Sequence, residues 1–238
     1  MKIRILSTLL ALAMSFFGFS QGSIQNISAA EFQKQIEKNP GIILDVRTPG
    51  ETAQGYIPDA SFIDFYDPEF KEKVKLMQKD KPIYVYCRSG GRSAKAAEIL
   101  KQNGFQEIYN LSGGIGAWTT AGYKVKKSSA NTKSEKAALS PQGFQDIIKS
   151  EDVVLVDFNT PWCSPCKKMA PIVQNISTEF KGKAHVLKVD VDKNKALAKA
   201  ENVVGVPVLA IYKNGEEVWR ESGTFTQKEL SSILQEYI

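Results

Sequence analysis

Short apolar runs alternate along the chain with stretches of helical periodicity. The runs at 42–46, 83–86 and 153–156 are mostly apolar, which is typical of strands buried on both faces of a sheet. Helical patterns lie between them, as in the segment that carries Phe32 and Ile36 on one face. Strands that alternate with helices predict an α/β fold, in which helices cover both faces of a parallel sheet.

Start and stop signals define the elements of the first half more closely. Ser28 and Glu31 have the spacing of a capping box, which predicts a helix start. A glycine-containing loop at 88–93 follows the second apolar run, and a helix is predicted at 94–102. A last short strand is predicted at 108–110.

A change of composition separates the chain into two halves. Residues 126–139 are rich in Lys, Ser and Ala and poor in large apolar side chains, which is typical of a linker. Beyond it, segments 207–212 and 217–221 predict an antiparallel hairpin. We therefore expect two α/β domains, one at 23–125 with a parallel sheet between helices and one at 140–238 with a mixed sheet flanked by helices.

Composition and charge limit the class of protein. The chain has 238 residues, of which 42% are hydrophobic and 24% charged, as in ordinary globular proteins of one or two domains. The net charge of +5 is mild. Outside the linker the Lys and Arg residues are scattered, so nucleic-acid binding is not expected.

The first twenty residues have the organisation of an export signal. Lys2 and Arg4 give the positive start, residues 5–19 the apolar middle, and 18–20 a small-x-small cleavage site. A retained membrane anchor is the alternative, but the apolar run is shorter than the roughly 18 residues that a span needs. We therefore expect residues 1–20 to be cleaved and the protein to be exported, in the setting of the bacterial periplasm.

Two cysteines lie where the third apolar run leads into a helical pattern. Cys163 is expected at the helix N-terminus and Cys166 one turn further on, with Pro165 in the first turn. The unpaired N–H groups and the dipole of a helix start favour an anion, so Cys163 is predicted to form a thiolate readily. A lone pair at this spacing fits a zinc site, a disulfide or a redox pair. The only histidine, His185, lies in a predicted strand, which argues against zinc.

The second apolar run ends at Cys87, the start of a loop that contains glycines and arginines. Gly90 and Gly91 let the backbone curl so that successive N–H groups converge on the sulfur. The following helix adds its dipole, and Arg88 and Arg92 add positive charge. No histidine is near in sequence, so this field must activate the thiolate. Cys87 is therefore expected to be a nucleophile that attacks an anionic substrate.

Loop 87–93 and the motifs around it resemble the single-domain rhodanese, or sulfurtransferase, family. The other matching motifs lie at 45–51, 55–60 and 111–123, so the resemblance covers about 26–125. It implies that the loop cysteine is a nucleophile that forms a persulfide. The loop residues expected to bind the substrate are Arg88, Ser89, Gly90, Gly91, Arg92 and Ser93.

A phosphatase is the rival interpretation of a cysteine loop that ends in arginine. Tyrosine phosphatases and their rhodanese-like cousins use C-x5-R, which gives a loop large enough for phosphate. Cys87 and Arg92 have the spacing C-x4-R. The tighter loop suits a single sulfur atom, which favours the sulfurtransferase.

The segment that contains Cys163 resembles the thioredoxin family. Asp157 stands where thioredoxins keep a buried carboxylate beneath the cysteine pair, and Lys188 matches the lysine that accompanies it. Val206–Pro207 matches the cis-proline loop that faces the thiols. One position departs from the pattern, since Asn159 stands where the best-known members have tryptophan.

This second resemblance implies roles for individual residues. Cys163 and Cys166 are expected to form a redox-active disulfide, and Asp157 to accept the proton of Cys166. The residues expected to contact the substrate are Trp162, Val206 and Pro207. Of the three cysteines, Cys87 is then left as the reactive thiol that an odd count suggests in an exported protein.

The two resemblances together favour a sulfur relay. Cys87 would take a sulfane sulfur from thiosulfate or a persulfide donor. Cys163 would attack the outer sulfur of that persulfide, and Cys166, deprotonated with help from Asp157, would expel sulfide. A membrane-bound electron donor would then reduce the disulfide. No metal or organic cofactor is required.

Two other functions remain open at this stage. The second domain could reduce disulfides in exported protein clients while the rhodanese-like domain acts independently. Alternatively, the rhodanese-like domain could be a binding module that presents clients to the dithiol.

Overall fold

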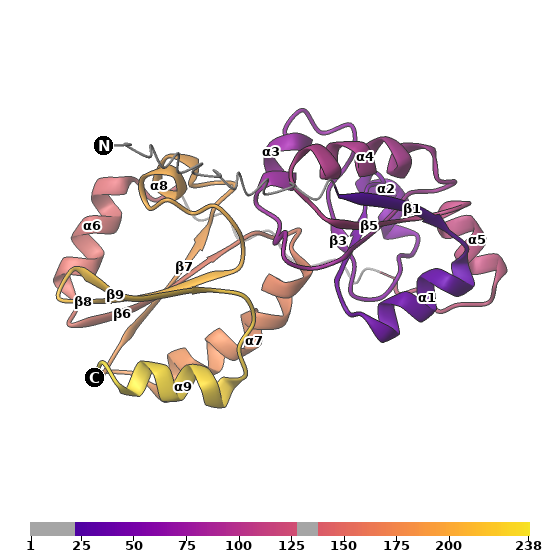
Figure 1. Cartoon of the computed structure of the whole chain (residues 1–238). Helices are drawn as coiled ribbons and strands as arrows, with labels where there is room; N and C mark the ends of the chain where they lie inside the picture. The colour runs from indigo at the N-terminus through magenta and orange to yellow at the C-terminus, as the bar shows by residue number, and fades with distance from the viewer. Residues whose placement is uncertain (1–21, 128–137) are drawn as a thin grey trace, which may run out of the picture.

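The computed structural model describes residues 22–127 and 138–238, which form two α/β domains (Figure 1). The predicted export signal at 1–20 lies outside these residues, as does most of the predicted linker. Within the two described ranges, no helix has the length and apolar character that crossing a membrane requires.

Within residues 22–127 the sheet has five strands in the order β1-β5-β4-β2-β3, and all neighbouring pairs are parallel. The strands are β1 (Ser23–Ile27), β2 (Ile42–Asp45), β3 (Ser61–Phe62), β4 (Ile83–Tyr86) and β5 (Glu107–Leu111). β4 lies at the centre of this sheet, so its carboxyl end, where Cys87 follows, is flanked by other strands on both sides.

Helices cover both faces of this sheet. They are α1 (Ala29–Lys38), α2 (Pro49–Ala53), α3 (Phe70–Lys75), α4 (Gly91–Gln102) and α5 (Gly114–Thr120). Successive side chains of β4 point to opposite faces. Ile83 and Val85 pack in one cluster with residues of α3 and α4, while Tyr84 and Tyr86 pack in another with α1 and α5. Both faces are apolar, which explains the unbroken run in the sequence.

Within residues 138–238 the sheet has four strands in the order β7-β6-β8-β9. β6 and β7 are parallel, whereas β8 is antiparallel to both β6 and β9. The strands are β6 (Val153–Asn159), β7 (His185–Asp190), β8 (Val208–Lys213) and β9 (Glu216–Ser222). One parallel and one mixed sheet confirm the predicted α/β class for both domains.

Two helices lie on each face of the second sheet, as Figure 1 shows. These helices are α6 (Pro141–Ser150), α7 (Ser164–Glu179), α8 (Lys195–Ala200) and α9 (Gln227–Gln235). α7 and α9 share one apolar cluster with β6 and β8. The cluster on the α6 and α8 face is continuous with the α3 and α4 face of the first domain, so the two domains have a common apolar contact.

The start of α4 differs from its prediction. The helix begins at Gly91, three residues before the expected start at 94, because Gly90 is the N-cap with a φ of 102°. This left-handed conformation suits glycine and turns the chain directly from the strand into the helix. As a result Arg92 and Ser93 lie in the first helical turn and not in the loop.

Two further predictions need correction. Only one of the two hydrogen bonds of the capping box at Ser28 forms. The Ser28 hydroxyl accepts the N–H of Glu31, but the Glu31 carboxylate accepts a hydrogen bond from the Gln35 amide and not from the Ser28 backbone. In addition, β1 was not expected, because its residues SIQNI are mostly polar. β1 is an edge strand, partly exposed to solvent, and such a strand needs no continuous apolar run.

Both ends of the predicted linker 126–139 are held by a domain. Tyr56 and Lys126 exchange two backbone hydrogen bonds of 2.8 Å, and the Leu139 N–H donates to the Asn194 side chain.

Candidate active site

The Cys87 sulfur lies at the start of α4 inside a ring of donors. Its Sγ accepts the N–H of Gly90 at 3.1 Å. The Ser93 hydroxyl lies 3.5 Å from this sulfur and 3.1 Å from the Gly90 carbonyl, and can donate its proton to either. Burial raises the pKa of Cys87, but hydrogen bonds from Ser93 and from the backbone of Ser89 and Gly90 outweigh it, so the pKa is below its ordinary value. The sulfur is therefore prepared to carry negative charge without a histidine.

Arg92 does not act as a free cation beside this sulfur. Its guanidinium donates two hydrogen bonds to Glu51, of 2.6 and 2.7 Å, and lies 5.6 Å from the centre of the Tyr66 ring. Arg92 lowers the pKa of Glu51 to about 2. Arg88, in contrast, is exposed, so it is the arginine of this loop that an arriving anion meets first.

Asp45 and Arg47 hold the segment that supplies Glu51. The Arg47 guanidinium donates to Asp45 at 2.6 and 2.9 Å and to the Gly55 carbonyl at 2.7 Å. Both side chains are buried. This pair shapes the backbone around α2 and so positions the acid that binds Arg92.

Gly114 explains why the motif at 111–123 belongs to the site. A Cβ at Gly114 would lie 2.4 Å from the Cys87 carbonyl oxygen and 2.6 Å from that of Arg88. The close approach lets the Ile115 N–H donate to the Cys87 carbonyl at 2.8 Å. The start of α5 thus fixes the backbone that carries the reactive sulfur.

The second thiol site lies at the start of α7. Cys163 is the N-cap residue, and its Sγ accepts the N–H of Cys166 at 3.1 Å. The two cysteines form a disulfide, with Pro165 in the first helical turn. The structure therefore shows this pair in its oxidised form.

Asp157 lies in β6, the strand that precedes the cysteine pair, and is 2% exposed. Burial raises its pKa to about 6, against the attraction of Lys188 and a hydrogen bond from Asn159. One carboxylate oxygen, Oδ1, has no hydrogen-bond partner among the described residues. A carboxyl group with this pKa and a free oxygen can accept a proton near neutral pH.

The role of Asn159 could not be inferred from the resemblance. Its Nδ2 donates to the Asp157 carbonyl at 3.0 Å and to the Asp157 carboxylate at 3.2 Å. A residue two positions along a strand lies on the same face, and that spacing was the available signal. Asn159 thus provides a polar neighbour at the position where tryptophan is usual.

Comparisons with known proteins match both domains. The family model for thioredoxin matches residues 135–236, and the model for the rhodanese-like domain matches 28–121. A thioredoxin of Synechocystis sp. is 38% identical over 94 residues, which are 40% of this chain and 88% of that protein. A thioredoxin of Haemophilus influenzae is 32% identical over 106 residues, which are 44% of this chain and 99% of that protein.

The chain belongs to the thioredoxin family. It carries a rhodanese-like domain in front of its thioredoxin domain, as the sequence predicted. Among solved structures, a mutant thioredoxin of Halobacterium salinarum is 33% identical and covers 46% of this chain and 96% of its own, with a TM-score of 0.39. The two domains support thiol-redox and sulfurtransferase chemistry in general, with thiol or persulfide substrates.

Trp162, Val206 and Pro207 are the residues expected to contact substrate in the thioredoxin domain. The Trp162 indole donates to Asp192 at 2.8 Å, which fixes the ring; Trp162 is 8% exposed. The Val206–Pro207 peptide bond is cis. The carboxylate of Asp192 was not predicted as part of the site, and no local motif pointed to it.

Among residues 22–127 and 138–238, no group of three or more His, Cys, Asp and Glu side chains could hold a metal ion. His185 is the first residue of β7 and is exposed, whereas Asp190 is the last residue of that strand.

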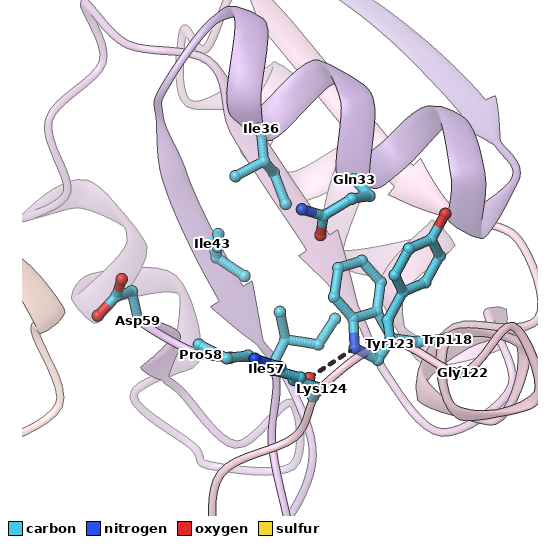
Figure 2. Close-up of a pocket in the computed structure, with 10 residues that line it drawn as sticks. All are labelled: Gln33, Ile36, Ile43, Ile57, Pro58, Asp59, Trp118, Gly122, Tyr123 and Lys124. Carbon is cyan, nitrogen blue, oxygen red and sulfur yellow. Dashed lines mark hydrogen bonds between the residues drawn. The ribbon is translucent and has the colours of Figure 1, made fainter.

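A cavity of about 460 Å³ in the rhodanese-like domain is separate from both sulfur sites. Figure 2 shows its apolar walls, which include Ile57, Trp118 and Tyr123, and the hydrogen bond from the Trp118 indole to the Lys124 carbonyl. No residue of loop 87–93 lines it. We assign it no part in the chemistry.

Proposed function

We propose that this protein moves a sulfane sulfur from a donor to its own dithiol and releases it as sulfide. The observation that carries the proposal is the Cys87 sulfur, held by donors from Gly90 and Ser93 in the same chain as the Cys163–Cys166 redox pair. A sulfur-accepting nucleophile and a reductant for its persulfide are then always present together.

The first step loads the rhodanese-like domain. The Cys87 thiolate attacks the outer sulfur of thiosulfate, or the sulfane sulfur of a persulfide. The donor's S–S bond breaks, and sulfite or a thiolate leaves with the bonding electron pair. The product is a persulfide on Cys87. Arg88, the exposed cation of the loop, would attract the anionic donor.

The second step consumes the reduced dithiol. The Cys163 thiolate attacks the outer sulfur of the Cys87 persulfide, which restores the Cys87 thiolate and leaves a persulfide on Cys163. Asp157 accepts the thiol proton of Cys166, directly or through water, and Cys166 attacks the Cys163 sulfur. Hydrosulfide leaves, and the disulfide seen in the structure forms. The two electrons gained by the sulfur come from the dithiol, which an external dithiol-type donor must reduce again.

Single-turnover experiments on fully reduced protein test this order of events. Wild-type protein loaded with thiosulfate should release one sulfide for each disulfide formed. Cys163→Ser should keep the extra sulfur on the Cys87 peptide. Cys166→Ser should carry it on the Cys163 peptide and release no sulfide, because the resolving thiolate is absent. Release from Cys163→Ser as fast as from wild type would contradict the relay.

Thiol–disulfide reduction of protein clients is the alternative function, favoured by the thioredoxin domain itself. The Cys87→Ser variant separates the two. A relay loses thiosulfate-dependent sulfide release in this variant, whereas an independent reductase retains full activity on a disulfide-bonded protein client.

We also propose that the protein is exported to the periplasm after cleavage of residues 1–20. The support is the charge and apolar pattern at the start of the sequence. The mass of the protein recovered from a periplasmic extract tests this, because the mature chain should begin at Gln21. A full-length chain in the cytoplasmic fraction would refute it.

A further inference from the structure

The rhodanese-like domain lies directly on the surface that surrounds the disulfide. The Phe62 N–H donates to the Trp162 carbonyl at 3.1 Å, and the Ser164 N–H donates to the Ser61 hydroxyl at 3.0 Å. Trp162 and Ser164 are the two neighbours of Cys163 in the sequence. Two residues of β3 are therefore bound on either side of the reactive cysteine.

A second segment of the same domain binds at the cis-proline loop. The Val206 N–H, which precedes Pro207, donates to the Leu76 carbonyl at 2.9 Å. Gln78 lies close to Gly223, with its Nε2 3.8 Å from where a Cβ would be. The chain segment after α3 therefore covers the other side of the disulfide.

With the two domains in this arrangement, the disulfide has almost no exposed surface. Cys163 is 3% exposed and Cys166 is 4% exposed. A thiol reduces a disulfide by attacking one sulfur along the S–S axis. Cys87 is as little exposed, at 1%, so low exposure alone does not exclude a small reagent. The bonds that β3 makes on either side of Cys163 are what we expect to block an external thiol until the rhodanese-like domain moves away.

The contacts are of a kind that an external partner would also make. The N–H of Ile63 donates into the sheet, to the Asp45 carbonyl at 3.1 Å, so the preceding N–H, of Phe62, points outward from the edge strand. Exposed strand edges pair readily with other backbone segments. The Trp162 carbonyl thus binds an extended strand, and the Val206 N–H binds a carbonyl at the helical C-cap residue Leu76. Both groups are open to a client segment only when the rhodanese-like domain has moved away.

The charged contacts around this interface are exposed, so each shifts the balance between the closed and open chain only a few-fold. Lys195 forms an ion pair with Glu69, and Lys168 with Asp59 at 3.5 Å; all four side chains are about half exposed. A cleft of about 920 Å³ lies between α3 and α8 beside them. Gln78 also has a buried Oε1 without a partner among the described residues, which weakens the closed form.

The closed arrangement also keeps the two reactive sulfurs apart. Tyr86 and Phe62 lie opposite one another across β2, and two strand spacings amount to about 10 Å. Trp162 lies beyond Phe62 at the outer edge. Because Cys87 follows Tyr86 and Cys163 follows Trp162, we expect a separation of roughly 15 Å between the cysteines.

We propose that the rhodanese-like domain is an intramolecular competitor for the partner surface of the thioredoxin domain. The oxidised chain is closed and opens before an external thiol, an extended client segment or the Cys87 persulfide reaches Cys163. This inference goes beyond the proposed function, because it concerns access to the disulfide whatever the source of the sulfur.

The rate at which dithiothreitol reduces the disulfide in the oxidised full chain tests the proposal. A Cys87→Ser background leaves one reactive site and makes the result independent of the sulfur relay. Glu69→Lys and Lys195→Glu should each speed reduction about threefold to tenfold, because each places like charges at the interface. The charge-swapped double variant should return to within about twofold of the wild-type rate.

Two further variants complete the test. One controls for the change of net charge, and the other should make reduction slower instead of faster. Glu37→Lys makes the same charge change at an exposed position of α1, which packs on the opposite face of the sheet from α3, and should leave the rate unchanged. Gln78→Met replaces the unpartnered buried amide by an apolar side chain of similar shape and should slow reduction about fivefold.

Hydrogen exchange of the Val206 amide gives an independent measurement. It should be protected in the wild type and exchange faster in Glu69→Lys, by the same factor as the reduction rate. Reduction at the wild-type rate in both charge-reversed single variants and in Gln78→Met would overturn the proposal. So would a Val206 amide that exchanges in the wild type as fast as an unprotected one.

Discussion

Replacing Asp157 by asparagine should stabilise the oxidised thioredoxin domain at neutral pH. The carboxyl group is 2% exposed, and burial raises its pKa from 3.8 to about 6. Asparagine has nearly the same shape and carries no charge. The variant therefore removes a buried negative charge while the packing around β6 stays the same.

The size of the effect follows from the two pKa values. The difference of about 2 between 3.8 and 6 corresponds to about 3 kcal/mol, at 1.36 kcal/mol for each pKa unit. Because the pKa is higher in the folded protein, the protonated carboxyl favours the folded state. That contribution is fully present below about pH 4 and is lost as the pH rises through about 6. Asp157→Asn should therefore gain about 3 kcal/mol over wild type at pH 7.5 and nothing at pH 3.5.

Native-state hydrogen exchange of core amides in β6 and β8 can measure this, because such amides report the unfolding of their own domain in a two-domain chain. Asp146→Asn is the matched control, since Asp146 lies on α6 in an exposed hydrogen bond to Gln142. The control should behave like wild type at both pH values. An Asp157→Asn variant with the wild-type unfolding free energy at pH 7.5 would refute the reasoning.

Three other perturbations have defined outcomes. Ser93→Ala should raise the pKa of Cys87, measured as the pH dependence of alkylation, because a side-chain donor to the sulfur is lost. Ser89→Ala should not raise it, because Ser89 acts through its backbone. Glu51→Gln should lower the free energy of unfolding by about 1–2 kcal/mol above pH 4.5. Wild type should lose the same stability as the pH falls from 4.5 toward 2, so in acid unfolding the difference between the two proteins should be full above that range and absent below it. Asn159→Leu removes a donor to the Asp157 carboxylate, so a ¹³C NMR titration should find the pKa of Asp157 above 6.

The central strands of both sheets could be predicted well from the sequence. β4 and β6 are buried on both faces, and only a continuous apolar run can satisfy such a position. The edge strands β1 and β3 lack this signal, because solvent or the other domain covers them. Their pairing is decided by tertiary contacts that no local pattern contains.

The chemistry of the sulfur sites could be predicted in kind but not in detail. The glycines of the Cys87 loop and the helix start at Cys163 indicated where thiolates would be favoured. The partner of Arg92 could not be predicted, because Glu51 is 41 residues away in the sequence. Arg92 therefore contributes less free charge than the loop composition suggests.

The contact between the domains had no sequence signal at all. Ser61 is an ordinary serine in the sequence, yet its hydroxyl accepts the amide that follows Cys163. Two further bonds join backbone groups, Phe62 to Trp162 and Val206 to Leu76. Backbone contacts depend on the relative placement of two folded domains, which residue types do not specify.

The direct test of the central claim is the fate of a single labelled sulfur. Reduced wild-type protein receives one equivalent of thiosulfate labelled in its sulfane sulfur, and peptides and released sulfide are analysed over time. The account predicts label first on the Cys87 peptide and then in sulfide, with the Cys163–Cys166 disulfide formed in equal amount. Label that never enters the Cys87 peptide, or sulfide released without formation of that disulfide, would contradict it.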